Sequence, residues 1–307
     1  MTSLLAEVVR SGYVEGHHYG SVIALRPDGS VALAIGDVAR PVFPRSSNKP
    51  LQAVGLLDAG WEPADEVEIA LACSSHSGEP GHLEAVRRIL GELPLGTPAQ
   101  PPLNLDAWYA ILRAGGEATP LTMNCSGKHA AMLRTCAANG WSTADYLEPE
   151  HPVQVACRER IEALAGEPVL HVAVDGCGAP QHALSLTGVA RAYARLVTTE
   201  RRVADAMRAH PWYVGGTGRD VTALMEGIPG LVAKDGAEGV YAVALADGSA
   251  VALKIDDGAE RARMPVLVAA LRVLGVDAPV LEQYAATPVL GGGRPVGEVR
   301  IAGSLLR

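Results

Sequence analysis

The chain has 307 residues, 48% of them hydrophobic, which is typical of a soluble globular protein with a full core. Its net charge of −8 and the lack of a basic cluster argue against a nucleic-acid surface, because phosphate binding needs concentrated positive charge. No apolar run reaches about 18 residues and no signal-like segment opens the chain, so we expect a cytoplasmic protein without a membrane anchor. The five cysteines are odd in number and are expected to be mostly reduced thiols.

Two β-hairpins are predicted, one near each end of the chain. Residues 21–25 and 31–35 flank a Pro-Asp-Gly turn, and residues 240–245 and 250–255 flank an Asp-Gly turn. Both hairpins are apolar enough to be largely buried. We expect them to pair with each other in one antiparallel sheet.

Helices are predicted between and after the hairpins. Helical periodicity is clear at residues 51–59, 80–93, 128–139, 153–165 and 259–274. Strands at both ends with helices between them indicate an α/β fold, with an antiparallel central sheet covered by helices. The Pro-rich residues 94–103 are interpreted as a surface loop, so residues 1–307 are expected to form a single domain.

Lysine is unusually rare in this sequence. Only four of the 26 basic residues are lysines, Lys49, Lys128, Lys234 and Lys254. A chain that uses arginine for most cations has reason to keep lysine where an amine must act as base or ligand. Chance retention is the alternative for any one of them, so the neighbours of each lysine decide.

The first candidate pair is Ser46-x-x-Lys49, just before a predicted helix. Residues three apart in a first helical turn share a face, so Lys49 could take the proton of Ser46. The exposed N–H groups of a helix start would also favour a developing anion. The structural alternative is that Ser46 caps the helix and Lys49 is solvated.

A second cluster spans Cys73 to Glu79 and also precedes a predicted helix. Helix capping can account for Ser77 and Glu79. It leaves Ser75 and His76 unexplained, so these two residues are candidates for catalysis or binding.

Two further clusters combine thiols with nitrogen and oxygen donors in Gly-containing turns. They are Cys125-x-x-Lys128-His129 and Asp175-Gly176-Cys177. Two thiolates with nitrogen donors would suit zinc. Inert, buried thiols are the alternative, since no C-x-x-C or H-x-x-x-H pair is present.

Jointly, these segments resemble the Rhizobium-type L-asparaginases, the thermolabile class also called asparaginase II or class 3. The resemblance covers nearly the whole chain. The motifs that carry it are Phe43-Pro44-Arg45-Ser46-x-x-Lys49, Cys73-Ser74-Ser75-His76-Ser77-Gly78-Glu79, Asn124-Cys125-Ser126-Gly127-Lys128-His129, Asp175-Gly176-Cys177-Gly178, Lys234-x-Gly236-Ala237-Glu238-Gly239-Val240 and Lys254-x-Asp256-Asp257-Gly258.

The resemblance implies a fold like that of the serine β-lactamases and glutaminases. It also implies two catalytic serine-lysine pairs, Ser46 with Lys49 and Ser75 with Lys254. Ser75 is favoured as the attacking serine, because His76 lies beside it in the sequence.

The same resemblance implies a zinc site and an assembly. Cys125, Lys128 and Cys177 match the zinc ligands, and the ion is expected to aid substrate binding or geometry. A homodimer is the implied assembly.

Four residues are expected to bind the substrate. They are Arg45, His76, His129 and Asp175. Charged groups such as Arg45 and Asp175 could hold the α-carboxylate and the α-ammonium of an amino acid.

The expected function is hydrolysis of L-asparagine to L-aspartate and ammonia through acyl transfer to a serine. Three alternatives stay open. A glutaminase differs by only one methylene of substrate. A penicillin-recognising serine hydrolase shares the S-x-x-K motif, although no clear S-D-N or K-T-G is present. A non-enzymatic zinc-binding scaffold or regulatory protein would use the same thiols.

Overall fold

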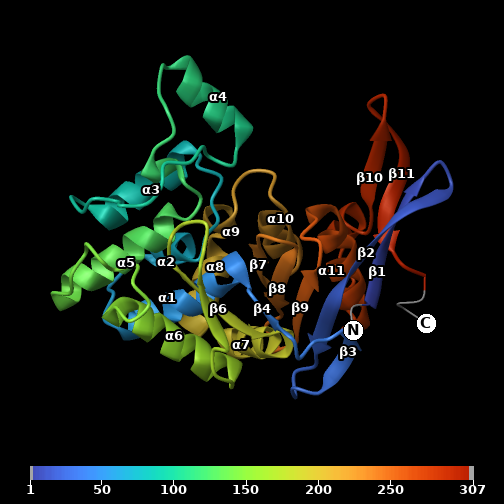
Figure 1. The fold of residues 1–307 in the computed structure, drawn as a ribbon, viewed down its shortest axis with the longest axis horizontal. Helices are drawn as coiled ribbons and strands as arrows, with labels where there is room; N and C mark the ends of the chain where they lie inside the picture. Colours follow the sequence, from blue (N-terminus) through green and yellow to red (C-terminus); the bar gives the residue numbers. More distant parts are fainter. Residues whose placement is uncertain (1–2, 304–307) are drawn as a thin grey trace.

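A large antiparallel sheet forms the centre of the fold, with strand order β10-β11-β1-β2-β9-β8-β7 and β3 paired to β2 (Figure 1). The computed structural model describes residues 3–303. The strands of this sheet are β1 (Ser3–Arg10), β2 (Tyr13–Leu25), β3 (Val31–Ile35), β7 (Val232–Gly236), β8 (Val240–Ala244), β9 (Ala250–Ile255), β10 (Thr287–Gly291) and β11 (Arg294–Ile301). A small sheet adds β4 (Pro41–Val42), β5 (His171–Val174) and β6 (Pro180–Ser185), in the order β4-β6-β5.

The two predicted hairpins are present and pair with each other. β2 and β3 form the first, and β8 and β9 form the second. β2 and β9 are antiparallel neighbours, with Val22 opposite Leu253. The prediction of one antiparallel sheet built from both ends of the chain is therefore confirmed.

Eleven α-helices lie among the described residues. They are α1 (Lys49–Asp58), α2 (Glu66–Ala72), α3 (Pro80–Leu90), α4 (Leu105–Arg113), α5 (Ser126–Asn139), α6 (Pro152–Ala165), α7 (Leu186–Thr198), α8 (Arg201–Ala209), α9 (Pro211–Val214), α10 (Asp220–Gly227) and α11 (Arg263–Val273). All five predicted helices exist, with ends displaced by a few residues. Sequence periodicity missed the others, several of which are only two turns long.

Helices cover the part of the central sheet formed by β2, β8 and β9. α7 and α11 both pack on β2, β8 and β9. Every residue of β8 is buried, so side chains on both faces of this strand are covered. The mixed α/β fold class, an antiparallel sheet with helices, is confirmed.

The helical half is built around α1. Residues 49–56 of this helix are all buried, because α2, α5, α6 and α8 pack around it. Lys49 and Gln52 are thus polar side chains buried within this bundle. Such buried polar groups need specific partners, which directs attention to the start of α1.

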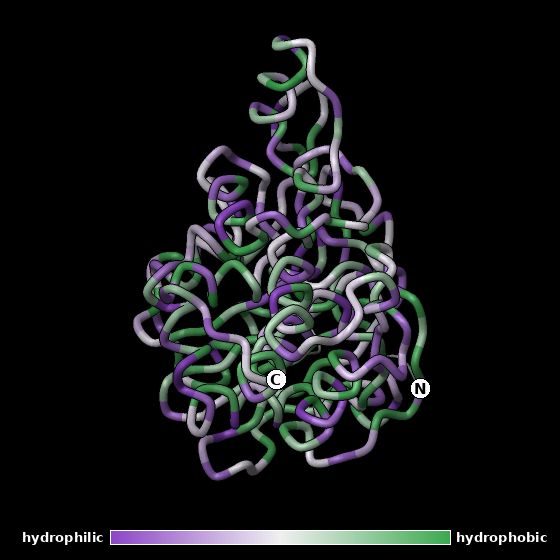
Figure 2. The backbone as a smooth tube through the Cα atoms, turned by 90° about the vertical axis from the view of Figure 1, so that its left-hand side faces the viewer, coloured by the Kyte–Doolittle hydropathy of each residue, from purple (hydrophilic) through white to green (hydrophobic). Residues whose placement is uncertain are grey.

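α4 stands apart from the rest of the helices. It projects from the body, and the hydropathy-coloured tube shows hydrophobic and hydrophilic residues mixed along the projection (Figures 1 and 2). None of its residues is buried. Within residues 3–303, no helix combines the length and the apolar character needed to cross a membrane.

Candidate active site

The turn before α1 is held against the end of β7. η1 (Arg45–Asn48) carries Arg45 with φ of 54°, a left-handed conformation that is uncommon for a residue other than glycine. A side chain at Gly236 on β7 would place its Cβ 2.4 Å from the carbonyl oxygen of Pro44, so only glycine permits this approach. Ser47 Oγ donates to the Lys234 carbonyl at 3.0 Å.

Lys49 reaches a serine from a different segment. Its Nζ donates to Ser75 Oγ at 3.1 Å and to the Ser74 carbonyl at 2.5 Å. Lys49 is 1% exposed and Ser75 is 3% exposed, so the contact lies inside the protein. A buried amine beside a hydroxyl is an arrangement that can transfer a proton.

The structure places Ser46 and Lys49 differently from the predicted pair. The backbone N–H of Lys49 donates to the carbonyl of Ser46, as expected one turn apart. Among the described residues, no hydrogen bond joins the two side chains. The spacing put Ser46 and Lys49 in one turn, and packing against the loop after α2 turned the amine toward Ser75.

Lys254 does not join Ser75, which corrects the second predicted pair. Its Nζ donates to the carbonyls of Glu238 and Ile255, at 2.5 and 2.7 Å. Lys254 lies on β9, and β8 separates β9 from β7 in the sheet. Its amine satisfies backbone groups at the end of the second hairpin.

Lys234 is a buried lysine near η1 that the predicted site omitted. It is 0% exposed on β7, and its Nζ donates to the carbonyl and the carboxylate of Asp235. Burial lowers the pKa of Lys234 to about 8, with Asp235 opposing the change and the charge of Lys49 adding to it. The sequence signal was a lysine within an apolar strand, which Lys234 shares with Lys254.

His76 contacts protein through both ring nitrogens. Nδ1 accepts from the Gly78 N–H at 3.1 Å, so Nε2 carries the proton and donates to Ser126 Oγ at 2.8 Å. Burial lowers the pKa of His76, which keeps the ring neutral. This histidine ties the loop after α2 to the start of α5 and has no nitrogen free for the predicted substrate contact.

A small polar cavity gathers several of the predicted residues. It has a volume of about 120 Å³ and is lined by Arg45, Ser46, Gln100, Asn124, Cys125, Asp175, Gly176, Cys177 and Ala237. Arg45 Nε donates to Asp175 Oδ1 at 2.8 Å, and Gly176 N–H donates to the same oxygen at 2.8 Å. The predicted substrate-binding pair of Arg45 and Asp175 therefore lies beside Ser46.

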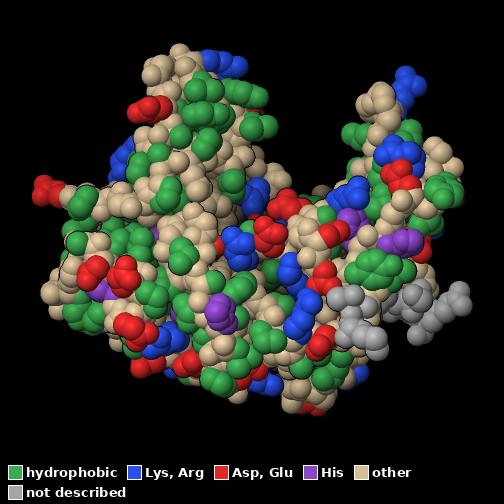
Figure 3. Space-filling view, viewed as in Figure 1, with side chains coloured by type: hydrophobic (Ala, Val, Ile, Leu, Met, Phe, Trp, Pro, Cys, Tyr) green, Lys and Arg blue, Asp and Glu red, His purple; other side chains and the backbone are tan. Residues whose placement is uncertain are grey.

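Figure 3 shows acidic and basic side chains together in the hollow between the two raised parts of the molecule.

The thiols and Lys128 meet at one end of this cavity. Lys128 Nζ donates to Cys177 Sγ at 3.2 Å, and Cys125 Sγ donates to Asn124 Oδ1 at 3.2 Å. The neighbouring Cys125 thiol, together with the charge of Lys128, holds the pKa of Cys177 far below its usual value despite burial. Proximity to Cys177, with burial, raises the pKa of Cys125.

This donor set can be tested against zinc. Two sulfurs and one amine nitrogen come together, and soft thiolates with nitrogen donors match the ion. In residues 3–303, no three His, Cys, Asp or Glu side chains are arranged to hold a metal. The fit therefore depends on Lys128 as the third ligand.

His129 lies next to the thiols in the sequence but faces Tyr146. Its Nδ1 is 2.8 Å from the Tyr146 hydroxyl, and burial lowers its pKa to about 4. Nε2 is buried without a hydrogen-bond partner among the described residues. His129 does not line the 120 Å³ cavity, so its predicted substrate contact is not seen.

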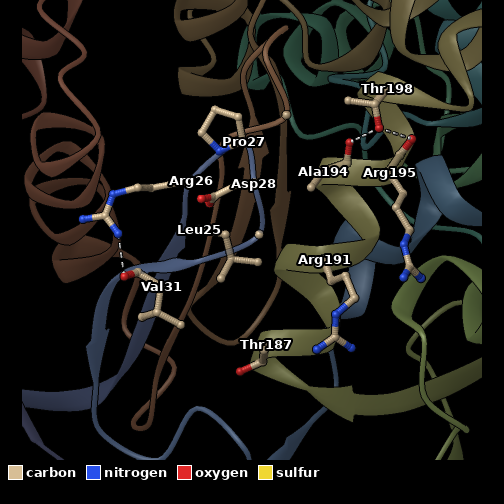
Figure 4. Close-up of a pocket in the computed structure, with 12 residues that line it drawn as sticks. Leu25, Arg26, Pro27, Asp28, Val31, Thr187, Arg191, Ala194, Arg195 and Thr198 are labelled. Carbon is tan, nitrogen blue, oxygen red and sulfur yellow. Dashed lines mark hydrogen bonds between the residues drawn. The ribbon is translucent and has the colours of Figure 1, made fainter.

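A larger cavity elsewhere contains none of the predicted catalytic residues. It has a volume of about 470 Å³ and lies between the β2–β3 turn and α7 (Figure 4). Its guanidinium groups are engaged by backbone carbonyls: Arg26 by Val31, Arg191 by Ala165 and Arg195 by Leu164. Asp28, Thr187 and Thr198 also line this cavity, whereas the predicted site residues Arg45, Ser46, Cys125, Asp175 and Cys177 line the smaller one.

Comparison with known proteins gives one match over nearly the full length. Residues 6–301 match the sequence family described as L-asparaginase II. No curated protein matches the chain.

Solved structures of a protein named Mglu are more distantly similar. One in its native form is 14% identical and covers 83% of this chain and 64% of that chain, with a TM-score of 0.46. A second, in 4.3 M NaCl, is 14% identical and covers 83% and 60%, again with a TM-score of 0.46. The chain thus spans less than two thirds of the length of these structures.

Proposed function

Because the chain belongs to the L-asparaginase II family, we propose that it hydrolyses the side-chain amide of L-asparagine to give L-aspartate and ammonia. One observation carries the proposal beyond family membership. Ser46 shares a cavity of about 120 Å³ with the Arg45–Asp175 ion pair, and the buried contact between Lys49 and Ser75 begins one helical turn away.

The cavity offers both charges that a free amino acid needs. Arg45 can bind the α-carboxylate and Asp175 the α-ammonium. Binding of the zwitterion would therefore replace the Arg45–Asp175 ion pair with two ion pairs to the substrate. The small volume favours a short amide over a longer one. One extra methylene in a pocket changes binding by about 1 to 3 kcal/mol, which supports asparagine over glutamine as the preferred substrate.

We assign the attack to Ser46 in place of Ser75. A nucleophile must touch the substrate, and of the two serines only Ser46 lines the cavity. Ser75 is buried against Lys49 and is better suited to pass a proton. This assignment reverses the preference that the sequence alone suggested.

The amines of Lys49 and Lys234 provide the base. Each buried ammonium disfavours a second charge nearby, and the pKa of Lys234 is lowered to about 8 by burial. The Lys234 amine is therefore mostly neutral above a pH of about 8. Ser46 Oγ attacks the amide carbon, and its proton goes to the departing ammonia. Lys49 relays this proton, for which its amine, held by Ser75 in the free protein, must turn toward Ser46 in the substrate complex. Water then attacks the ester, which releases aspartate and returns the proton to Ser46.

The oxyanion of each tetrahedral intermediate needs donors at the cavity wall. Ala237 lines the cavity just after β7, so its backbone N–H and that of Ser46 are the candidates. A single donor of this kind is commonly worth about 3 kcal/mol of transition-state stabilisation.

Zinc is proposed as a bound ion held by Cys125, Lys128 and Cys177. Bound there, it would supply fixed positive charge beside the cavity. In this structure Lys128 is a cation. Burial opposes its charge, but Cys177, Cys125 and Asp175 together raise its pKa. Lys128 and Cys125 must each lose a proton to become ligands, so acid should weaken zinc binding.

A homodimer is proposed on the basis of exposed apolar side chains. Leu105, Tyr109 and Leu112 on α4 are 63%, 48% and 47% exposed. They recur at helical spacing and form one apolar stripe. Sedimentation equilibrium of the wild type and of a Leu105→Glu, Leu112→Glu variant tests this. A monomeric wild type would exclude the dimer.

Ammonia release tests the activity directly. Wild type, Ser46→Ala, Ser75→Ala and the surface control Ser30→Ala are incubated with L-asparagine and separately with L-glutamine. We expect asparagine to be preferred, and both Ser46→Ala and Ser75→Ala to lose most activity while Ser30→Ala retains it.

Two outcomes would overturn the proposal. If the wild type releases no ammonia with and without added zinc, the chain is not an asparaginase. If a β-lactam labels Ser46 while asparagine is untouched, the penicillin-recognising alternative is correct.

A further inference from the structure

A buried carboxylate is shared between the candidate catalytic lysine and an arginine on another element. Asp235 Oδ1 accepts from Lys234 Nζ, and Asp235 Oδ2 accepts from Arg219 NH2 at 2.9 Å. Each carboxylate oxygen thus has its own cation. Asp235 is 12% exposed as a side chain and Arg219 is 23% exposed, so solvent screens this pair only in part.

The same guanidinium contacts the segment that carries Ser75. Arg219 NH1 donates to the Ser75 carbonyl at 3.4 Å, and Ser75 N–H donates to the Val214 carbonyl at 3.1 Å. Arg219 follows α9 and immediately precedes α10, which packs against β7. One side chain therefore links the Ser75 loop to the strand that carries Lys234.

We propose that Arg219 is a positioning residue for the hydrolysis: by binding Asp235 and the Ser75 carbonyl together, it fixes Lys234 and the Ser75 loop in one arrangement and limits how strongly Asp235 holds the lysine proton. The inference rests on the proposed function and names no contact between Arg219 and substrate.

The charges around Lys234 give the direction of the effect. Asp235 favours the charged form of Lys234, whereas the charges of Lys49 and Arg219 disfavour it. Arg263 also acts on Asp235 and pairs with Asp220 at 3.0 Å. The neutral groups that face this cluster are the Cys73 thiol and the hydroxyls of Tyr193 and Tyr241. Removing the Arg219 cation leaves Asp235 more strongly coupled to Lys234, so the lysine should keep its proton to higher pH.

Three substitutions separate charge from geometry. Arg219→Gln removes the cation, and we expect the titration of Lys234 to move up by about one pH unit. Asp235→Asn removes the carboxylate and should lower the pH midpoint of the Lys234 titration. Arg219→Lys keeps the charge but is shorter and lacks the two separate nitrogens that reach Asp235 and the Ser75 carbonyl, so the midpoint should stay while kcat falls about tenfold.

Lysine NMR reads the midpoint without relying on activity. The chain has four lysines, so lysine labelled at the ε-carbon gives four side-chain signals to follow against pH. The signal missing from Lys234→Met identifies the relevant one. Arg158→Gln is the control, because Arg158 pairs with Glu150 at the surface and carries the same charge change.

The proposal is supported if Arg219→Gln raises the Lys234 midpoint and moves the acid limb of kcat/KM by the same amount, while Arg158→Gln changes neither. It is overturned if the midpoint stays in a folded Arg219→Gln protein, or if it moves and the acid limb does not. Should Arg219→Gln fail to fold, the other two variants decide. An unchanged Lys234 midpoint with a lower kcat in Arg219→Lys, together with a lowered midpoint in Asp235→Asn, supports the proposal, and any other result overturns it. A wild type that releases no ammonia would remove the proposed function and with it the catalytic role of Arg219. The NMR shift alone would then decide the contact network.

Discussion

Lys49 Nζ lies 3.1 Å from Ser75 Oγ, so the lysine of the S-x-x-K motif meets a serine that is 26 residues away in the chain. This contact joins the start of α1 to the loop after α2. It joins two separate sequence motifs in one buried contact near the Ser46 cavity, to which we assign the proton transfer in the proposed reaction.

Lys49→Met should remove the base while keeping an apolar stem of similar length in the core. We expect kcat to fall by about 10³-fold, a usual loss for a positioned acid-base group. Ammonia release measures this, with circular dichroism to confirm folding. A folded Lys49→Met protein with activity within a factor of ten of wild type would contradict the role.

Ser46→Ala and Ser75→Ala should fail in different ways. Without Ser46 no acyl-enzyme can form, whereas without Ser75 acylation should slow by at least about 10²-fold but still occur. Rapid acid quench of an asparagine reaction, followed by mass spectrometry of the intact protein, would detect one added aspartyl group. Finding that adduct on Ser46→Ala would show that another residue attacks.

Lys234 and Lys254 provide a matched comparison, since each lies in an apolar strand. Burial lowers the pKa of Lys234 to about 8, so kcat/KM should fall as pH drops below that value and the Lys234 amine becomes charged. Lys234→Met should lower kcat by at least about 10²-fold, and the fall of kcat/KM at low pH should disappear. Lys254→Met should lose less than about tenfold, because its amine meets only backbone carbonyls. The reverse order would restore Lys254 as the partner of Ser75.

Zinc occupancy should depend on pH. Cys125 and Lys128 have raised pKa values and must both lose protons to bind the ion, so occupancy should rise with pH. Equilibrium dialysis followed by metal analysis measures occupancy, and Cys136→Ser is the thiol control outside the cluster. Equal zinc content in wild type and Cys125→Ser would place the ion elsewhere.

Three buried histidines should make the fold sensitive to mild acid. Burial lowers the pKa of His76, and lowers the pKa values of His129 and His182 to about 4. The unfolded chain takes up these protons near pH 6.5 and the folded chain does not, so stability falls as pH drops through about 6.5. Each histidine should contribute about 1.4 kcal/mol per pH unit.

Urea unfolding between about pH 7 and about pH 5 tests this slope before most carboxylates titrate. His182→Gln should reduce the slope, whereas the exposed His17→Gln should leave it unchanged. A flat stability profile over this range would show that the three histidines titrate normally.

The sequence by itself determined the pairing of the two hairpins at the centre of the sheet and most of the segments that line the small cavity. The turn residues of both hairpins are local signals, and their apolar strands have few ways to be buried except against each other. Ser46, Cys125 and Asp175 were found because reactive side chains in Gly-rich or helix-start turns stand out from a solvated background.

Only the tertiary structure decided which of these groups meet. Lys234 and Lys254 carry the same local pattern, but the strand order places β7 against η1 and puts β9 two strands away. The direction of Lys49 depends on how α1 packs beside the loop after α2, a contact between segments that local spacing does not encode. His76 likewise was a candidate for substrate binding from the sequence alone. In the fold its ring is buried and hydrogen-bonded to Ser126 at the start of α5.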